Sequence, residues 1–217
     1  MSEARDNILS RLSAAPRRPV PDLPEWNPPA YGDGRLAQFT RMLEASHAEV
    51  HEVTEADWPE RLLGILANRG LETVIFAPGT PVGDRLAAAW AGRERAPALV
   101  PYDRPIEDLK ADLVHAIGAG ITAARGGIAE TGTLILWPHA DEPRLMSLLP
   151  PLHIAVVEES MLVDNLAQAV RAGGWAGGLP TNALLISGPS KTADIEQTLA
   201  YGVHGPKELI VLIVRSG

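Results

Sequence analysis

The chain has 217 residues, of which 46% are hydrophobic and 21% are charged, and these values fit one globular domain with room for an additional arm. Its formal net charge of −8 excludes nucleic acid as an expected partner, because an acidic surface repels phosphate groups. The absence of cysteine excludes disulfides, zinc–thiolate sites and iron–sulfur ligation by this chain.

The sequence contains no recognisable targeting or membrane segment. Its N-terminal residues are charged and lack the apolar core of a secretory signal. No apolar run approaches the ~20 residues that span a bilayer. We therefore expect a soluble, cytoplasmic protein without membrane insertion.

The N-terminal region predicts a helix followed by an extended segment. Residues 3–14 have the pattern of a short amphipathic helix, for which Ser2 is a suitable N-cap. Six prolines lie within residues 16–29 and exclude a helix or a central strand there. The segment of about residues 16–35 is here called the proline arm. A packed arm and a disordered linker both fit this composition. Trp26 and Tyr31 favour the packed arm, since disordered segments are poor in aromatic residues.

From residue 36 onwards, helical and strand-like patterns alternate. The helical patterns cover the face marked by Leu36, Phe39, Met42 and Leu43, and then residues 54–68, 82–91, 160–172 and 190–200. The strand patterns cover residues 48–53, 73–77, 98–100, 113–117, 133–137, 154–157, 183–186 and 209–214. Apolar strands between helices predict an α/β fold, with a mostly parallel sheet and helices on both faces. We assign this domain to residues 36–217, preceded by the helix and arm of residues 1–35.

The first candidate motif is GIAETGT, at residues 127–133, directly before a predicted strand. Glu130 is a candidate catalytic carboxylate that can serve as a base, a nucleophile or a substrate anchor. Thr131, Gly132 and Thr133 are candidate ligand-binding residues, since a glycine allows a close approach to the backbone. The alternative is a tight turn in which Glu130 accepts backbone N–H bonds.

The second motif is SGPSKTADIE, at residues 187–196, which follows a predicted strand and opens a predicted helix. Ser190 is a suitable N-cap, and the free N–H groups behind it form an anion pocket to which Lys191 adds charge. Gly188 lets a ligand approach the backbone, and Asp194 is a candidate catalytic acid. The alternative is a well-capped structural helix, because acids are favoured in a first turn.

The third motif is GVHGPK, at residues 202–207. His204 lies beside Gly205 and has little packing from its neighbours, so its imidazole can face a cleft as an acid–base group or anion donor. The alternative is a polar turn residue. We expect the three motifs to converge on one cleft, and we expect no metal site.

Residues 118–123 match the G-x-G-x-x-A fingerprint of dinucleotide-binding turns, and Asp141 lies at the expected spacing. However, the following segment contains Gly126 and Gly127, which disfavour the crossover helix that this fold requires. A single match of this kind is weak evidence for nicotinamide binding.

Four strings occur in the same order as in one known family: IAETGT, RLMSLLPPLHI, SGPSKTADIE and GVHGPKEL. Together they resemble the LUD domain, and in particular the lactate-utilisation protein C family. The resemblance implies a fold similar to the glucosamine-phosphate deaminase, ribose-phosphate isomerase and CoA-transferase superfamily. It also implies a role in oxidising L-lactate to pyruvate, alongside partner subunits that carry iron–sulfur clusters.

Two main hypotheses of function follow. The first is a non-redox subunit of a lactate-oxidising complex that binds a small anion and has no cofactor of its own. The second is a free-standing enzyme of the CoA-transferase or sugar-phosphate-isomerase type, with Glu130 as its catalytic carboxylate. A nicotinamide-dependent dehydrogenase that uses residues 118–123 is a third hypothesis, which the sequence favours least.

Overall fold

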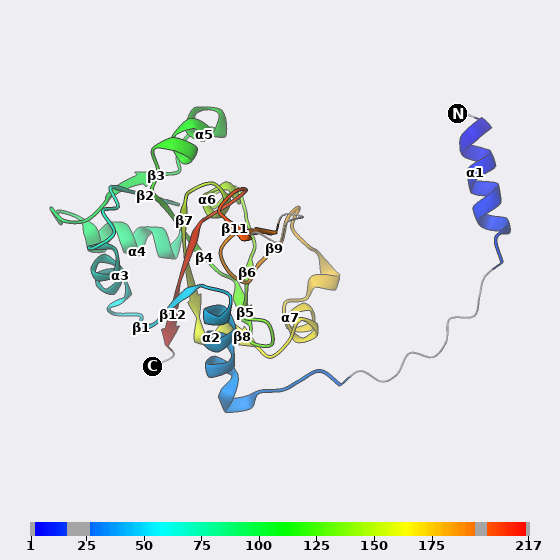
Figure 1. Cartoon of the computed structure of the whole chain (residues 1–217), viewed down its shortest axis with the longest axis horizontal. Helices are drawn as coiled ribbons and strands as arrows, with labels where there is room; N and C mark the ends of the chain where they lie inside the picture. The colour runs from blue at the N-terminus through cyan, green and yellow to red at the C-terminus, as the bar shows by residue number, and fades with distance from the viewer. Residues whose placement is uncertain (1–2, 17–26, 194–198, 216–217) are drawn as a thin grey trace.

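The computed structural model describes residues 3–16, 27–193 and 199–215 (Figure 1). Its centre is a six-stranded sheet in which every neighbouring pair is parallel. The strands, in spatial order, are β1 (Glu49–Thr54), β12 (Glu208–Arg215), β7 (Leu152–Glu158), β4 (Ala119–Ala123), β2 (Thr73–Phe76) and β3 (Ala98–Pro101). A parallel sheet of this kind is the predicted architecture, and its buried strands need cover on both faces.

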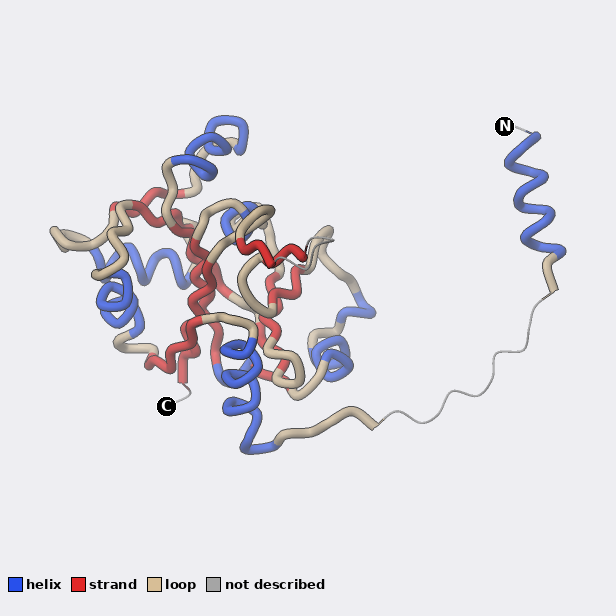
Figure 2. Tube along the Cα trace, viewed as in Figure 1, coloured by secondary structure: helices blue, strands red, loops and turns tan. Residues whose placement is uncertain are grey.

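One face of this central sheet is covered by two helices, α3 (Trp58–Leu66) and α4 (Pro81–Trp90). Alternate side chains of β7 and β12, such as Ile154 and Leu212, pack with Trp58 and Trp90 in one apolar cluster. Figure 2 shows both helices on the same side of the strands. Trp58 and Trp90 are therefore core residues.

The opposite face is covered by a helix and by a second sheet. This four-stranded sheet contains β8 (Leu162–Val163), β5 (Gly126–Ile128), β6 (Thr133–Leu136) and β9 (Leu184–Ile186), in that order. Phe39 and Leu43 of α2 (Arg35–Ala45) are fully buried against Leu134 of β6 and Val157 of β7. Part of the expected helical cover is thus a sheet, because the chain turns back after β4 and forms short strands.

Three further helices complete the domain. They are α5 (Ile106–His115), α6 (Leu145–Leu148) and α7 (Leu166–Ala172). Leu109 and Leu113 of α5 pack on Ile75 of β2, and Ala169 of α7 packs on Ile128 and Ile135 of the second sheet. The N-terminal helix α1 (Glu3–Ala14) has no buried residue. No helix in the described ranges is long and apolar enough to cross a membrane.

The prediction of a strand at residues 113–117 is wrong. Leu113 belongs to α5 and lies one helical turn after Leu109, on the face that packs against Ile75. The predicted helix over residues 160–172 is reduced to α7, whose N-cap Asn165 accepts a hydrogen bond from the Gln168 N–H.

The prediction of a helix over residues 190–200 is also wrong. Here the chain forms β10 (Lys191–Ala193), which pairs in an antiparallel manner with β11 (Leu199–Tyr201). The Ser190 N–H donates to the Pro206 carbonyl, and the Ser190 carbonyl accepts from the Gly202 N–H, each over 2.9 Å. These contacts extend the hairpin, so Ser190 is not a helix cap.

Residues 118–123 do not form a dinucleotide-binding turn. Residues 119–123 are β4, inside the central sheet. A Cβ at Gly120 would lie 2.1 Å from the carbonyl oxygen of Met146, so the strand needs glycine where α6 crosses it. Gly120, the second glycine of the fingerprint, is therefore explained by the close contact between the backbones of β4 and α6.

The end of the arm packs on the domain. Tyr31 contacts the apolar cluster around α2, and the Pro29 carbonyl accepts a hydrogen bond from Asn165 over 3.1 Å. Arg35 binds Asp164 over 2.6 Å. Trp26 and Ser2 lie outside the described residues.

The contact between Gly120 and Met146 predicts a selective loss of stability. Gly120→Ala should lower the free energy of unfolding by about 3 kcal/mol, because a methyl group there overpacks against backbone. Gly64→Ala is the control, since Gly64 has open space around its Cα inside α3, and it should raise stability by roughly 0.5–1 kcal/mol. Urea unfolding of both variants measures this. Equal effects at the two positions would contradict the packing account.

Candidate functional site

A cleft of about 220 Å3 opens between the two sheets. It lies at the amino ends of β7 and β12, where His153 and Leu209 are the second residues of their strands, and beyond the carboxyl end of β9, where Ser187 follows Ile186. Its polar side chains come from separate segments: Ser147, His153, Ser187, Ser190 and His204. A concave site with a few converging polar groups is the usual form of a ligand site.

His153 and Ser147 are the buried polar residues among those that line this cleft, and His153 is the one that can be ionised. Its side chain is on the face of β7 that meets the second sheet, and the residue is only 2% exposed. Its Nε2 lies 2.8 Å from Oγ1 of Thr122 on the neighbouring strand β4. Burial lowers the pKa of His153 to about 4, so the imidazole is neutral at neutral pH.

The second and third motifs form one wall of the cleft. Ser190 and Pro206 are joined by the backbone bond described above, and a Cβ at Gly205 would lie 3.0 Å from Cβ of Ser190. Gly188 also lines the cleft, and a Cβ there would lie 2.6 Å from the Ser46 carbonyl oxygen. The structure thus brings together Gly188, Ser190, His204 and Gly205.

The first motif does not line the cleft, but its hydroxyl groups are linked to a residue of the cleft wall. Thr131 Oγ1 lies 2.6 Å from Thr133 Oγ1, which lies 2.7 Å from Ser187 Oγ at the cleft wall. Glu130 is not among the lining residues, and its backbone N–H donates to the Asp164 carbonyl over 2.9 Å. The second and third motifs therefore share the cleft, whereas the first motif only contacts its wall, and the predicted convergence of all three motifs on one cleft is not found.

Gly132 has a packing role in that turn. It has a φ of 60°, and a Cβ there would lie 2.5 Å from the backbone nitrogen of Leu43. The turn can therefore sit directly against α2. This close contact agrees with the alternative hypothesis that residues 127–133 contain a tight structural turn.

The predicted anion pocket at a helix start is wrong. Lys191 is exposed at the beginning of β10, and it does not line the cleft. No helix begins at Ser190, so free N–H groups and a helix dipole are not available there. Asp194 lies outside the described residues.

Glu142 is a partly buried ionisable group beside the cleft. Its two carboxylate oxygens accept from the Ala123 N–H over 3.0 and 3.2 Å, at the end of β4. Burial raises the pKa of Glu142 to about 7, although the hydrogen bond from Ala123 opposes this shift. Glu142 shares a small cavity with Thr122 and Ser147, which connects it to the surroundings of His153.

Sequence reasoning missed both groups. His153 interrupts an otherwise apolar strand, LHIAVV, and a polar residue at such a position is the sequence signal that could have identified it as a candidate site residue. Glu142 had no such signal, because the residues that bury it are distant in the sequence or belong to its own loop. In the described ranges, no group of three or more histidines and acids is placed to hold a metal ion.

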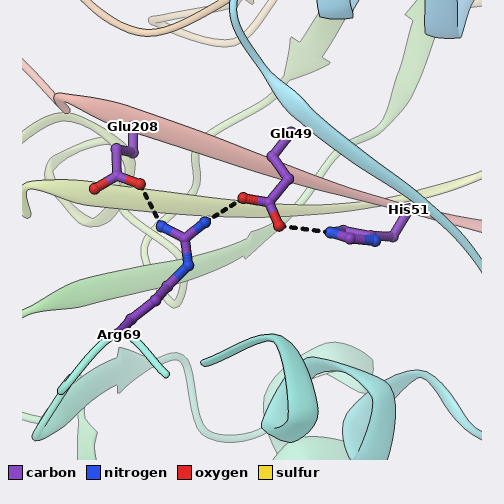
Figure 3. A network of polar contacts seen from close by, with 4 residues as sticks. All are labelled: Glu49, His51, Arg69 and Glu208. Atoms are coloured by element: carbon purple, nitrogen blue, oxygen red, sulfur yellow. Dashed lines mark hydrogen bonds and ion pairs between the residues drawn. The ribbon is translucent and has the colours of Figure 1, made fainter. Parts of the chain in front are cut away.

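A charged network lies at the amino ends of β1 and β12 (Figure 3). Arg69 bridges Glu49 of β1 and Glu208 of β12, and Glu49 also lies 2.7 Å from Nε2 of His51. Figure 3 shows the guanidinium between the two carboxylates. This arrangement ties the two strands to the loop after α3, and we assign it a structural role.

Comparison with known proteins places these features in a family. The family model of the LUD domain matches residues 36–214, which include the cleft and every described strand except the last residue of β12. The chain belongs to the LUD-domain family. This membership agrees with the resemblance carried by the four sequence strings.

Several similar proteins span nearly the whole LUD-domain chain. An uncharacterized protein of Neisseria meningitidis serogroup B is 34% identical over 97% of this chain and 93% of its own length. A lactate utilization protein C of Deinococcus radiodurans is 32% identical over 94% and 88%, and lactate utilization protein C 1 of Bacillus mycoides is 28% identical over 97% and 96%. A solved structure of a DUF162 family protein from Deinococcus radiodurans has a TM-score of 0.60 and 26% identity, covering 86% of this chain and 99% of that one.

The two shifted pKa values predict opposite effects of pH on stability. The pKa of His153 is lower in the folded state, so its contribution is lost as pH falls from about 6.5 to 4. The pKa of Glu142 is higher in the folded state, so its contribution is lost as pH rises from about 4.5 to 7. Each shift corresponds to roughly 3 kcal/mol at most.

Two variants separate these effects. His153→Gln should flatten the loss of stability below pH 6.5, and Glu142→Gln should flatten the loss between pH 4.5 and 7, because each removes one titrating group. Urea unfolding from pH 4 to 7.5 measures both profiles against the wild type. Variant profiles that stay parallel to the wild type would show that neither group is perturbed in the fold.

Proposed function

We propose that this LUD-domain protein is a non-redox subunit of a complex that oxidises L-lactate to pyruvate, and that its cleft binds a small anion. The observation that carries the proposal is similarity over nearly the whole length to proteins named lactate utilization protein C. The cleft supports ligand binding, since polar groups from β7, from the end of β9 and from the loop before β12 meet there.

The chemistry of the reaction supports the role of a partner. Oxidation of L-lactate to pyruvate releases two electrons and two protons, so an electron acceptor must be present. The chain has no cysteine, and iron–sulfur clusters are held mainly by cysteine thiolates. We therefore assign the iron–sulfur clusters to partner subunits and ligand binding or assembly to this chain.

The alternative of a free-standing enzyme that uses Glu130 has no specific contact in its favour. Glu130 does not line the cleft, and it is held in a turn between α2 and the second sheet. A catalytic carboxylate has to reach the reacting atoms.

Deletion and native purification test the proposed role. Deleting the gene in the source organism should abolish growth on L-lactate and leave growth on pyruvate unchanged, and supplying the chain again should restore it. A tagged chain should co-purify from lactate-grown cells with cysteine-rich iron–sulfur proteins. Normal growth of the deletion strain on L-lactate would contradict the proposal.

The purified chain alone should be colourless and free of stoichiometric iron. The reason is the lack of thiolate ligands in its sequence. Visible absorption spectra and iron analysis provide the measurement, with the co-purified complex as the coloured positive control. A visible band with stoichiometric iron in the isolated chain would overturn this assignment.

A further inference from the structure

The lining of the cleft is uncharged. Among the described residues that line it, the polar side chains are three serines and two histidines, and none is Asp, Glu, Lys or Arg. A phosphate dianion or a pyrophosphate would lose hydration there without a full positive charge in return. The cleft therefore suits a small ligand with at most one negative charge, and its 220 Å3 is below the roughly 300–1,000 Å3 typical of pockets for larger ligands.

The walls combine polar and apolar surface. Leu148, Leu185, Ile186 and Leu209 supply apolar side chains, while Ser187 and Ser190 supply hydroxyl groups. His204 is exposed at the opening. This combination fits a short carboxylic acid that has a small apolar end.

His153 is the residue that can make a directional hydrogen bond to a ligand in the cleft. Its Nε2 is bound to Thr122, which fixes the ring, and within the described residues Nδ1 has no protein partner. If the Thr122 hydroxyl donates to Nε2, then Nδ1 carries the proton and can donate to a ligand oxygen. The residue is 2% exposed and lines the cleft, and Nδ1 is not among the fully buried side-chain atoms that lack a partner, so this nitrogen is accessible to a ligand in the cleft.

We propose that His153 binds the oxygen on carbon 2 of a short 2-hydroxy or 2-oxo monocarboxylate, with Thr122 as the residue that positions its ring. The choice of L-lactate and pyruvate as probes rests on the proposed function. A neutral imidazole is suited to this task, because it donates one hydrogen bond to a hydroxyl or carbonyl oxygen without attracting phosphates. Burial supports the neutral form, since the pKa of His153 is lowered to about 4.

Calorimetric titration of the purified full chain tests the assignment. The probes are L-lactate, pyruvate, propionate and inorganic phosphate. Propionate has the same carboxylate and carbon chain as lactate and lacks only the 2-hydroxyl group. We expect the wild type to bind lactate or pyruvate about tenfold more tightly than propionate, as for the loss of one buried hydrogen bond, and to bind phosphate weakly.

Variants identify the group responsible. His153→Leu should lower the affinity for lactate about tenfold and leave that for propionate unchanged. Thr122→Val should reduce the same discrimination, and Thr122→Ser should restore it, because serine keeps the hydroxyl group. His115→Gln is the matched control, since His115 is exposed on α5 and does not line the cleft. It should bind as the wild type does.

Several outcomes would overturn the assignment. They are equal affinity of the wild type for lactate and propionate, tightest binding of phosphate, no binding of any probe at millimolar concentration, or full discrimination in Thr122→Val. The wild-type comparison remains decisive if His153→Leu fails to fold. If the binding assignment fails but iron–sulfur proteins still co-purify with the chain, only the role of His153 is refuted. If co-purification fails but lactate is still distinguished from propionate, only the proposed role as a subunit of the complex is refuted.

Discussion

The parallel pairing of six strands exposes two apolar faces, and the architecture follows from how each face is covered. The helices α3 and α4 cover one face completely enough to bury Ile154 and Leu212. The other face is shared between α2, α5, α6 and the second sheet. Between α6 and the end of β9 this cover is incomplete, and the cleft lies there, at the amino ends of β7 and β12. The site is thus a consequence of covering one sheet with another.

A histidine inside such an interface has an energetic cost. Alternation along β7 sends Ile154 to the helical side and His153, with Ala155, to the side of the second sheet. An apolar residue at position 153 would avoid the desolvation that lowers the pKa of the imidazole. Thr122 compensates only one ring nitrogen. Groups that break the local packing rule in a cleft are frequently functional, and Glu142 beside it has the same character.

Most strands of the central sheet could be predicted from the sequence because both of their faces are buried, whereas β4 was missed because Gly120 and Thr122 interrupt its apolar run. Apolar runs such as those in β2, β7 and β12 favour buried strands of a parallel sheet. Residues 113–117 resemble a strand because this short run does not include Leu109, whose spacing of one helical turn from Leu113 indicates the helix α5. The hairpin of β10 and β11 was mistaken for a helix because the local capping signal of Ser190 was outweighed by pairing with a segment further along the chain. The candidate site was recognised through its loops, whereas His153 depends on a contact between β4 and β7 that only the folded chain provides.

The most direct measurement is a nitrogen-15 NMR spectrum of the histidine ring nitrogens, with His153→Leu used to assign the signal of His153. The account predicts a neutral His153 ring from pH 7.5 down to pH 5, with an Nδ1 signal that shifts when L-lactate is added. A ring that gains its proton near the ordinary pKa of about 6.5, and is unaffected by saturating L-lactate, would contradict the account.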